Sequence, residues 1–157
     1  MSSRLFQHVR EREGLAYSIY AFYDFFFDTG VFGVYAGMDA SRVQKVLSMI
    51  LSELHSLVST SVSEEELTRI KSQLKGNLML GLESTSNRMM RLAKLEMYLK
   101  EYSTLDETIA DIDRVTAEEI QGIAQDLFDS QKLVVTILGP VKDNIITQDA
   151  LYNNSFD

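Results

Sequence analysis

Hydrophobic residues recur along this chain with two different periods, one typical of helices and one of strands. The longest helical pattern follows Asp39, a residue type that often caps a helix N-terminus. Its apolar positions are Val43, Val46, Leu47, Ile50, Leu51, Leu54, Leu57 and Val58. Intervals of three and four residues place such positions on one side of a helix. The pattern therefore predicts an amphipathic helix after Asp39.

Two runs rich in β-branched and aromatic residues, 15–23 and 31–37, predict an antiparallel pair of strands. The loop between them ends in Asp28-Thr29-Gly30. Because side chains alternate across a strand, we expect the first run to place Leu15, Tyr17, Ile19, Ala21 and Tyr23 on one face. Ala16, Ser18, Tyr20 and Phe22 would share the other face. Residues 3–13 predict a short helix, which Gly14 can end in a left-handed conformation.

The middle of the chain reads as helical, because three Ser/Thr-x-x-Glu sequences mark helix starts. These pairs are Ser63 with Glu66, Thr104 with Glu107, and Thr116 with Glu119. In the first of these helices we expect Leu67, Ile70, Leu74 and Leu78 to face inward. The further predicted elements are a break at 81–87, helices over 88–100, 105–112 and 117–128, and a short buried strand over 133–138.

This order of elements predicts an α+β fold in which helices pack on one face of an antiparallel sheet. We expect one domain over residues 1–140 and a poorly ordered tail over 141–157. Three strands are few for so much helix. The last strand is therefore expected at a sheet edge, or beside strands that this sequence does not contain.

Composition narrows the range of partners. The formal net charge of −8 argues against nucleic acid and against insertion at an anionic membrane surface. The absence of cysteine excludes disulfides and thiolate metal ligands. No apolar run approaches the roughly 20 residues of a membrane span, and no signal peptide is visible. We expect a cytoplasmic location, with the periplasm or an organelle as alternatives.

Motifs for self-contained catalysis are missing from the sequence. Its two histidines, His8 and His55, belong to neither H-E-x-x-H nor H-x-x-E-H, so no metal site is predicted. There is no G-x-S-x-G nucleophile elbow, no dinucleotide fingerprint and no P-loop. Arg10 and Tyr17 lie on either side of Gly14. Taken alone, they are typical of a solvated helix face and of packing on a half-buried strand.

Several segments, in order, resemble the C-terminal half of the insulinase and mitochondrial processing peptidase family, which are zinc peptidases with an inverted motif. The resemblance spans residues 2–140. It is carried by Ser3-Arg-Leu-Phe-Gln7, Val9-Arg-Glu11, Gly14-Leu-Ala-Tyr-Ser18, Asp28-Thr-Gly-Val-Phe-Gly-Val-Tyr-Ala-Gly37, Glu64-Glu-Glu-Leu67 with Lys71, Leu74, Lys75 and Leu78, and Leu138-Gly-Pro140.

The resemblance implies a processing-peptidase-like domain that supplies the substrate-contacting half of a zinc endopeptidase. Arg10 would hold a backbone carbonyl of the peptide substrate. Tyr17 would donate a hydrogen bond to the oxyanion as zinc-bound water attacks. Zinc itself is expected in a missing N-terminal half or in a partner subunit, so this chain alone is predicted to be inactive. The alternatives are a non-catalytic scaffold subunit of the same family and an unrelated α+β interaction module.

Compared with the family, the chain begins in the middle of a motif, and we expect an incomplete domain without its opening strands. Sheet edges left exposed in this way can pair with another chain, including a second copy. Phe25, Phe26 and Phe27 add an apolar group to the predicted hairpin loop. They would either pack locally under the loop or form an interface with the other half.

Overall fold

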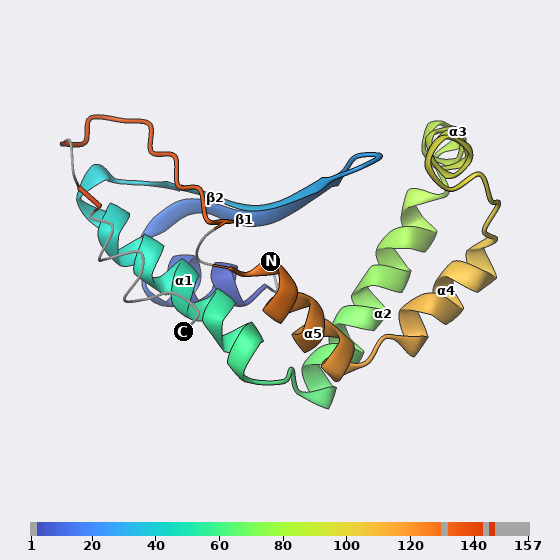
Figure 1. Cartoon of the computed structure of the whole chain (residues 1–157), viewed down its shortest axis with the longest axis horizontal. Helices are drawn as coiled ribbons and strands as arrows, with labels where there is room; N and C mark the ends of the chain where they lie inside the picture. The colour runs from blue at the N-terminus through green and yellow to red at the C-terminus, as the bar shows by residue number, and fades with distance from the viewer. Residues whose placement is uncertain (1–2, 130–131, 143–144, 147–157) are drawn as a thin grey trace. The chain divides into compact units, whose positions relative to one another are not determined.

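The structure is a computed structural model, and it describes residues 3–129, 132–142 and 145–146, apart from the side chain of Leu99. The chain divides into two units. The first contains residues 1–60 and 122–157, and the second contains residues 61–121. Figure 1 shows their elements, and each unit is described here by itself.

The first unit is built on an antiparallel hairpin of β1 (Ala16–Phe25) and β2 (Gly30–Met38). Phe26 N donates to Thr29 O at 2.8 Å and closes the loop between the strands. The predicted pair of strands is therefore confirmed. Among the described residues this is a two-stranded sheet, and the far end of the hairpin extends away from α1 (Figure 1).

A β-bulge near the start of β1 changes which side chains share a face. Ala16 pairs with Met38 and Ser18 pairs with Gly37, so Tyr17 is an extra residue without a partner in β2. One extra residue reverses the alternation of side chains on either side of it. The prediction that Tyr17 shares a face with Leu15 and Ile19 is wrong: Tyr17 is 70% exposed, whereas the other two are buried.

The core of the first unit lies on one face of the hairpin, against η1 (Phe6–Arg12) and α1 (Val43–Ser59). A short 3-10 turn, η2 (Ala40–Arg42), precedes α1. The Asp39 side chain accepts a hydrogen bond from Ser41 N at 2.9 Å, as expected of a cap. The core residues are Leu5, Val9, Leu15, Ala16, Ile19 and Val46, with Val34, Ala36, Met38, Met49 and Ile50 packed against them. The α+β prediction is confirmed.

The C-terminal part of the first unit differs from the prediction. Residues 133–138 form no strand, and Val134 and Leu138 are exposed. A strand forms when a neighbour pairs with its backbone, and the described sheet contains only β1 and β2. The predicted tail lies mostly outside the described residues, since only 141–142 and 145–146 of it are placed, and it stays a prediction.

Helix α5 (Ala117–Leu127) brings the two sequence segments of the first unit together. Gln125 Nε2 donates to Val58 O at 3.3 Å. Just beyond the helix, the ring of Phe128 packs 5.3 Å from the ring of Phe32 in β2. These contacts place the chain near residue 122 beside the end of α1.

The second unit contains a series of capped helices. They are α2 (Glu64–Gly81), α3 (Thr85–Lys94), η3 (Leu95–Leu99) and α4 (Leu105–Arg114), followed by the start of α5. Thr104 and Thr116 form the predicted reciprocal caps with Glu107 and Glu119. The Ser63 side chain accepts from Glu66 N at 3.2 Å. The break predicted over 81–87 is found but is shorter, because α2 continues to Gly81 and α3 begins at Thr85 and not at 88.

Helix α2 contacts α4 through two lysine side chains. Lys71 Nζ donates to Asp113 O at 2.9 Å, and Lys75 Nζ donates to Asp113 Oδ1 at 2.7 Å. Leu67 is buried as predicted, but Ile70 and Leu74 are exposed. Their predicted inward placement is wrong, because the polar contacts of this stretch of α2 with α4 are made by Lys71 and Lys75 on another side of the helix.

No single helix in the described ranges is both long and apolar enough to cross a membrane. The helical segments 40–59 and 64–81 meet the criteria of length and composition only when they are taken as a pair.

Candidate functional site

The candidate site is built around the joint between η1 and β1. Gly14 has a φ of +59°, in the left-handed region that glycine adopts without steric cost. Its N–H donates to Arg10 O at 3.2 Å, and Leu15 N donates to Val9 O at 3.0 Å. The backbone that carries Arg10 is therefore held against the start of the strand that carries Tyr17.

Arg10 projects from η1 and is exposed. Its guanidinium carbon lies 4.9 Å from the centre of the Phe6 ring, a cation–π arrangement that limits the directions the side chain can take. The contact between Phe6 and Arg10 was not predicted from the sequence. The signal was present, because an aromatic residue four positions before an arginine on a helix lies next to it.

Three polar contacts fasten η1 and the residues that flank it to α1, and so limit the rotation of the helix that carries Arg10. Arg4 Nη1 donates to Ser56 Oγ at 3.0 Å, and His8 Nδ1 contacts Glu53 Oε1. Lys45 Nζ donates to Glu13 Oε2 at 2.5 Å.

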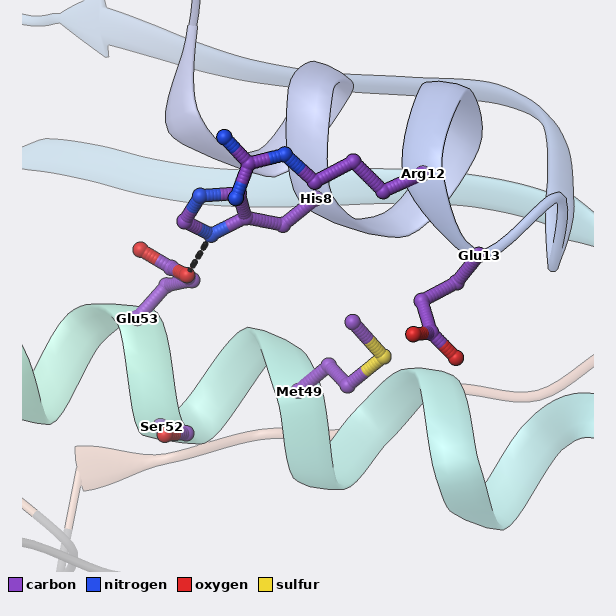
Figure 2. Close-up of a pocket in the computed structure, with 6 residues that line it drawn as sticks. All are labelled: His8, Arg12, Glu13, Met49, Ser52 and Glu53. Atoms are coloured by element: carbon purple, nitrogen blue, oxygen red, sulfur yellow. Dashed lines mark hydrogen bonds and ion pairs between the residues drawn. The ribbon is translucent and has the colours of Figure 1, made fainter.

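The contact between Lys45 and Glu13 also changes the pKa of the glutamate. The hydrogen bond and the charge of Lys45 lower the pKa of Glu13 below its ordinary value. A groove of about 250 Å³ lies between the two helices, and Figure 2 shows the side chains that line it. It is lined by His8, Arg12, Glu13, Met49, Ser52 and Glu53. Neither Arg10 nor Tyr17 lines this groove, so it supports the candidate site without being part of it.

The bulge turns Tyr17 to the face of the hairpin opposite the core. There its ring lies against Gly37, which is buried although it stands on the outer face. Tyr20 follows on the same face, with its ring 5.1 Å from the ring of Tyr35 and nearly parallel to it.

Arg10 and Tyr17 are both available to a ligand. In the part of the chain that the structure describes, no hydrogen bond or ion pair joins the two side chains. Arg10 offers a fixed fork of N–H donors, and Tyr17 offers one phenolic O–H donor. Two donors on exposed side chains at one backbone joint can bind the carbonyl oxygens of a peptide.

The described residues do not fit a zinc site. No group of three or more His, Asp or Glu side chains converges among them. His8 already contacts Glu53. Zinc needs three or four converging ligands, so the described part of this chain offers at most isolated ones.

Comparison with known proteins gives the family. Residues 1–74 match the family model described as "Peptidase M16 inactive domain". An uncharacterized zinc protease of Streptomyces coelicolor is 40% identical over 91% of this chain and 31% of that protein. An uncharacterized zinc protease of Bacillus subtilis is 39% identical over 89% of this chain and 34% of that protein. The chain thus spans about a third of the length of these relatives.

Solved structures agree with the fold. A chain of complex III from Candida albicans, solved with Inz-5 bound, has a TM-score of 0.71 and 25% identity, covering 80% of this chain and 30% of that one. A conserved protein from Enterococcus faecalis has a TM-score of 0.67 and 32% identity, covering 78% of this chain and 28% of that one. On these grounds the chain belongs to the M16 peptidase family, the insulinase and processing peptidase family that its sequence resembles, and corresponds to a C-terminal domain of it.

Proposed function

We propose that this chain is the substrate-contacting part of a zinc-dependent endopeptidase, with Arg10 and Tyr17 as the residues that engage the peptide. The observation that supports this most is the bulge at Tyr17, which turns an aromatic side chain out of the core at the joint that also carries Arg10. Bulges often redirect a side chain beside an active site. A role in the hydrophobic core would have kept Tyr17 on the buried face of the hairpin.

In this proposal each residue has a separate task. Arg10 binds a backbone carbonyl of the extended peptide and positions it. Tyr17 donates its phenolic proton in a hydrogen bond to the oxygen that becomes negative at the scissile carbonyl. A donor placed at that oxygen stabilises the transition state more than the ground state. Zinc ligands belong to another part of the protein or to a partner subunit, because the described residues do not provide them.

The proposal is tested by Tyr17→Phe in the assembled protein that also contains the zinc-bearing part. The coding DNA upstream of the Met1 codon, and then the neighbouring reading frame, is the first place to look for that part. Loss of one oxyanion donor typically lowers kcat by 10²–10³-fold. We therefore expect a fall in kcat of about 10²-fold with little change in KM.

Tyr20→Phe is the matched control, because it removes the same hydroxyl from an exposed tyrosine on the same face of β1. It should leave kcat unchanged. An unchanged kcat in Tyr17→Phe, or an equal loss in both variants, would contradict the role given to Tyr17.

The isolated chain provides a second test. We expect it not to hydrolyse unfolded peptides at any zinc concentration. Hydrolysis by the purified chain that a chelator abolishes and zinc restores would show that this assignment of the zinc is wrong.

The second candidate function is a non-catalytic scaffold or partner subunit. The matched family model is described as an inactive domain, and this favours it. In that case an upstream or partner half would have the family pattern without H-x-x-E-H, and Tyr17→Phe would change no measurable activity. For either function we propose the zinc-bearing half, or its inactive counterpart, as partner, with self-association through the sheet edges as a further contact. A cytoplasmic location remains our proposal.

A further inference from the structure

Gly37 occupies a position in β2 where glycine is costly. A glycine inside a strand adds no side-chain packing and loses more backbone freedom on folding than other residues. Its backbone does not require glycine, because among the described glycines only Gly14 and Gly139 have a positive φ. Another reason must account for the missing side chain.

That reason is the ring of Tyr17. A Cβ atom added to Gly37 would lie 2.5 Å from Cε2, 2.8 Å from Cζ and 3.0 Å from the phenolic oxygen of Tyr17. Ordinary contacts between carbon atoms begin at about 3.5 Å. The outer half of the ring thus fills the space that any other residue at position 37 would occupy.

The bulge and this space act together. The bulge sends the Tyr17 side chain to the outer face, opposite no residue of β2. The missing side chain at the neighbouring Gly37 then gives the ring a surface on which to lie. We propose that Gly37 is a positioning residue, which sets the place of the Tyr17 hydroxyl by leaving room for its ring.

This inference rests on the function proposed for Tyr17 and adds a residue to that site. A methyl group at position 37 would push the hydroxyl end of the ring outward by about 1 Å to restore ordinary contact. Displacements of about 1 Å can lower the rate of an enzyme by about 10²-fold. Gly37 therefore affects the reaction through Tyr17 and need not touch the substrate itself.

A matched control lies four residues away on the same strand. A Cβ atom added to Gly33 would meet the ring of Phe22, coming within 2.8 Å of Cε1. Gly33→Ala therefore disturbs an aromatic ring over a glycine on the same face, just as Gly37→Ala does. It does not disturb Tyr17.

The kinetic experiment is a double-mutant cycle in the assembled protein. We expect Gly37→Ala to lower kcat at least tenfold with KM nearly unchanged, and Gly33→Ala to leave kcat as it is. In the Tyr17→Phe background, Gly37→Ala should cause no further loss, because the hydroxyl that it displaces is gone. An equal loss in both backgrounds would overturn the inference.

A second measurement does not depend on Gly37→Ala folding, nor on any activity. An aromatic ring lying on Gly37 shifts the α-proton NMR signals of that residue upfield. In the folded chain, Tyr17→Leu should move these signals downfield and leave those of Gly33 unchanged. Unmoved Gly37 signals would overturn the inference. If they move but Tyr17→Phe keeps full kcat, the ring lies where we place it and the proposed function is what fails.

Discussion

At the residue scale, the direction of Arg10 depends on Phe6. Arg10 is exposed and carries its charge in water, where a long side chain samples many rotamers. The half-buried Phe6 ring offers the guanidinium a face to lie on. If Arg10 binds the peptide as proposed, order in its side chain beforehand would reduce the entropy lost on binding.

Phe6→Leu should therefore weaken substrate binding through Arg10 while keeping an apolar side chain at position 6. An exposed cation–π contact is worth about 0.5–1 kcal/mol. This corresponds to a rise in KM of about two- to fivefold, measured by steady-state kinetics in the assembled protein. Arg12→Lys on the same helix is the control and should leave KM unchanged. Additive effects of Phe6→Leu and Arg10→Ala would show that the two residues act independently.

At the element scale, η1 is held on α1 by charged and polar side chains above a small apolar contact. Val9 is the buried residue of η1 and is completely inaccessible, and Leu5, just before the helix, is also buried. The Glu13–Lys45 pair lies at the C-terminal end of η1, next to Gly14. It therefore acts at the point where the helix joins β1.

This pair predicts a contribution to stability that depends on pH. The Lys45 hydrogen bond lowers the pKa of Glu13 below its ordinary value of 4.5. Its stabilisation is thus complete above that value and is lost as the pH falls through the lowered pKa in the folded state. The denaturation midpoint of the protein should exceed that of Glu13→Gln at pH 6, and the difference should vanish in acid.

The same difference should shrink at high salt, because both side chains are substantially exposed. Glu11→Gln removes a charge from the same helix and serves as the control. A difference between the protein and Glu13→Gln that persists at pH 2 would contradict the role of the ion pair.

Helices and strands that local sequence determines could be predicted. An element that needs a distant strand to pair with could not. The hairpin, α1 and the caps at Thr104 and Thr116 follow from periodicity and side-chain chemistry that act within a few residues. Residues 133–138 have the composition of a strand, but no described strand pairs with them. Their pairing is a long-range property that composition does not contain.

The candidate site shows the same division. The resemblance singled out Arg10 and Tyr17, and the left-handed Gly14 was predicted from its place after a helix. The bulge was not predictable, because strict alternation gives an equally plausible face for Tyr17. The contact with Gly37 was missed as well, since it joins residues that are twenty positions apart.

At the scale of the whole molecule, the far end of the hairpin is an exposed apolar region of the first unit. Phe25 is 77% exposed and Phe27 is 84% exposed, although the Phe25 ring also lies 5.3 Å from the ring of Tyr23. Neighbouring exposed aromatic side chains at one end of a hairpin are typical of an interaction surface. We assign it to contact with the other half of the proposed peptidase.

Without that half, the isolated chain should self-associate through these rings. Replacing Phe25 and Phe27 together by serine should shift the chain toward monomer, as measured by sedimentation velocity across a range of concentrations. Tyr102→Ser, which removes an exposed aromatic residue from the second unit, is the control. Equal self-association of the unchanged chain, the double serine variant and Tyr102→Ser would refute the assignment of the surface.

The division of the chain into two units also affects how the stability of the first unit depends on residues 61–121. Residues 61–121 form one continuous segment between the two parts of the first unit. Just outside its two ends, Gln125 Nε2 donates a hydrogen bond to Val58 O. Closing such a loop costs entropy that grows only with the logarithm of its length, by about 0.6 kcal/mol for each doubling. This segment can thus gain or lose many residues with little effect on the stability of the hairpin and α1. A protease cut within this segment would instead divide the chain into two molecules. α5 would then have to bind the hairpin and α1 as a separate molecule, so the stability of the first unit would depend on protein concentration.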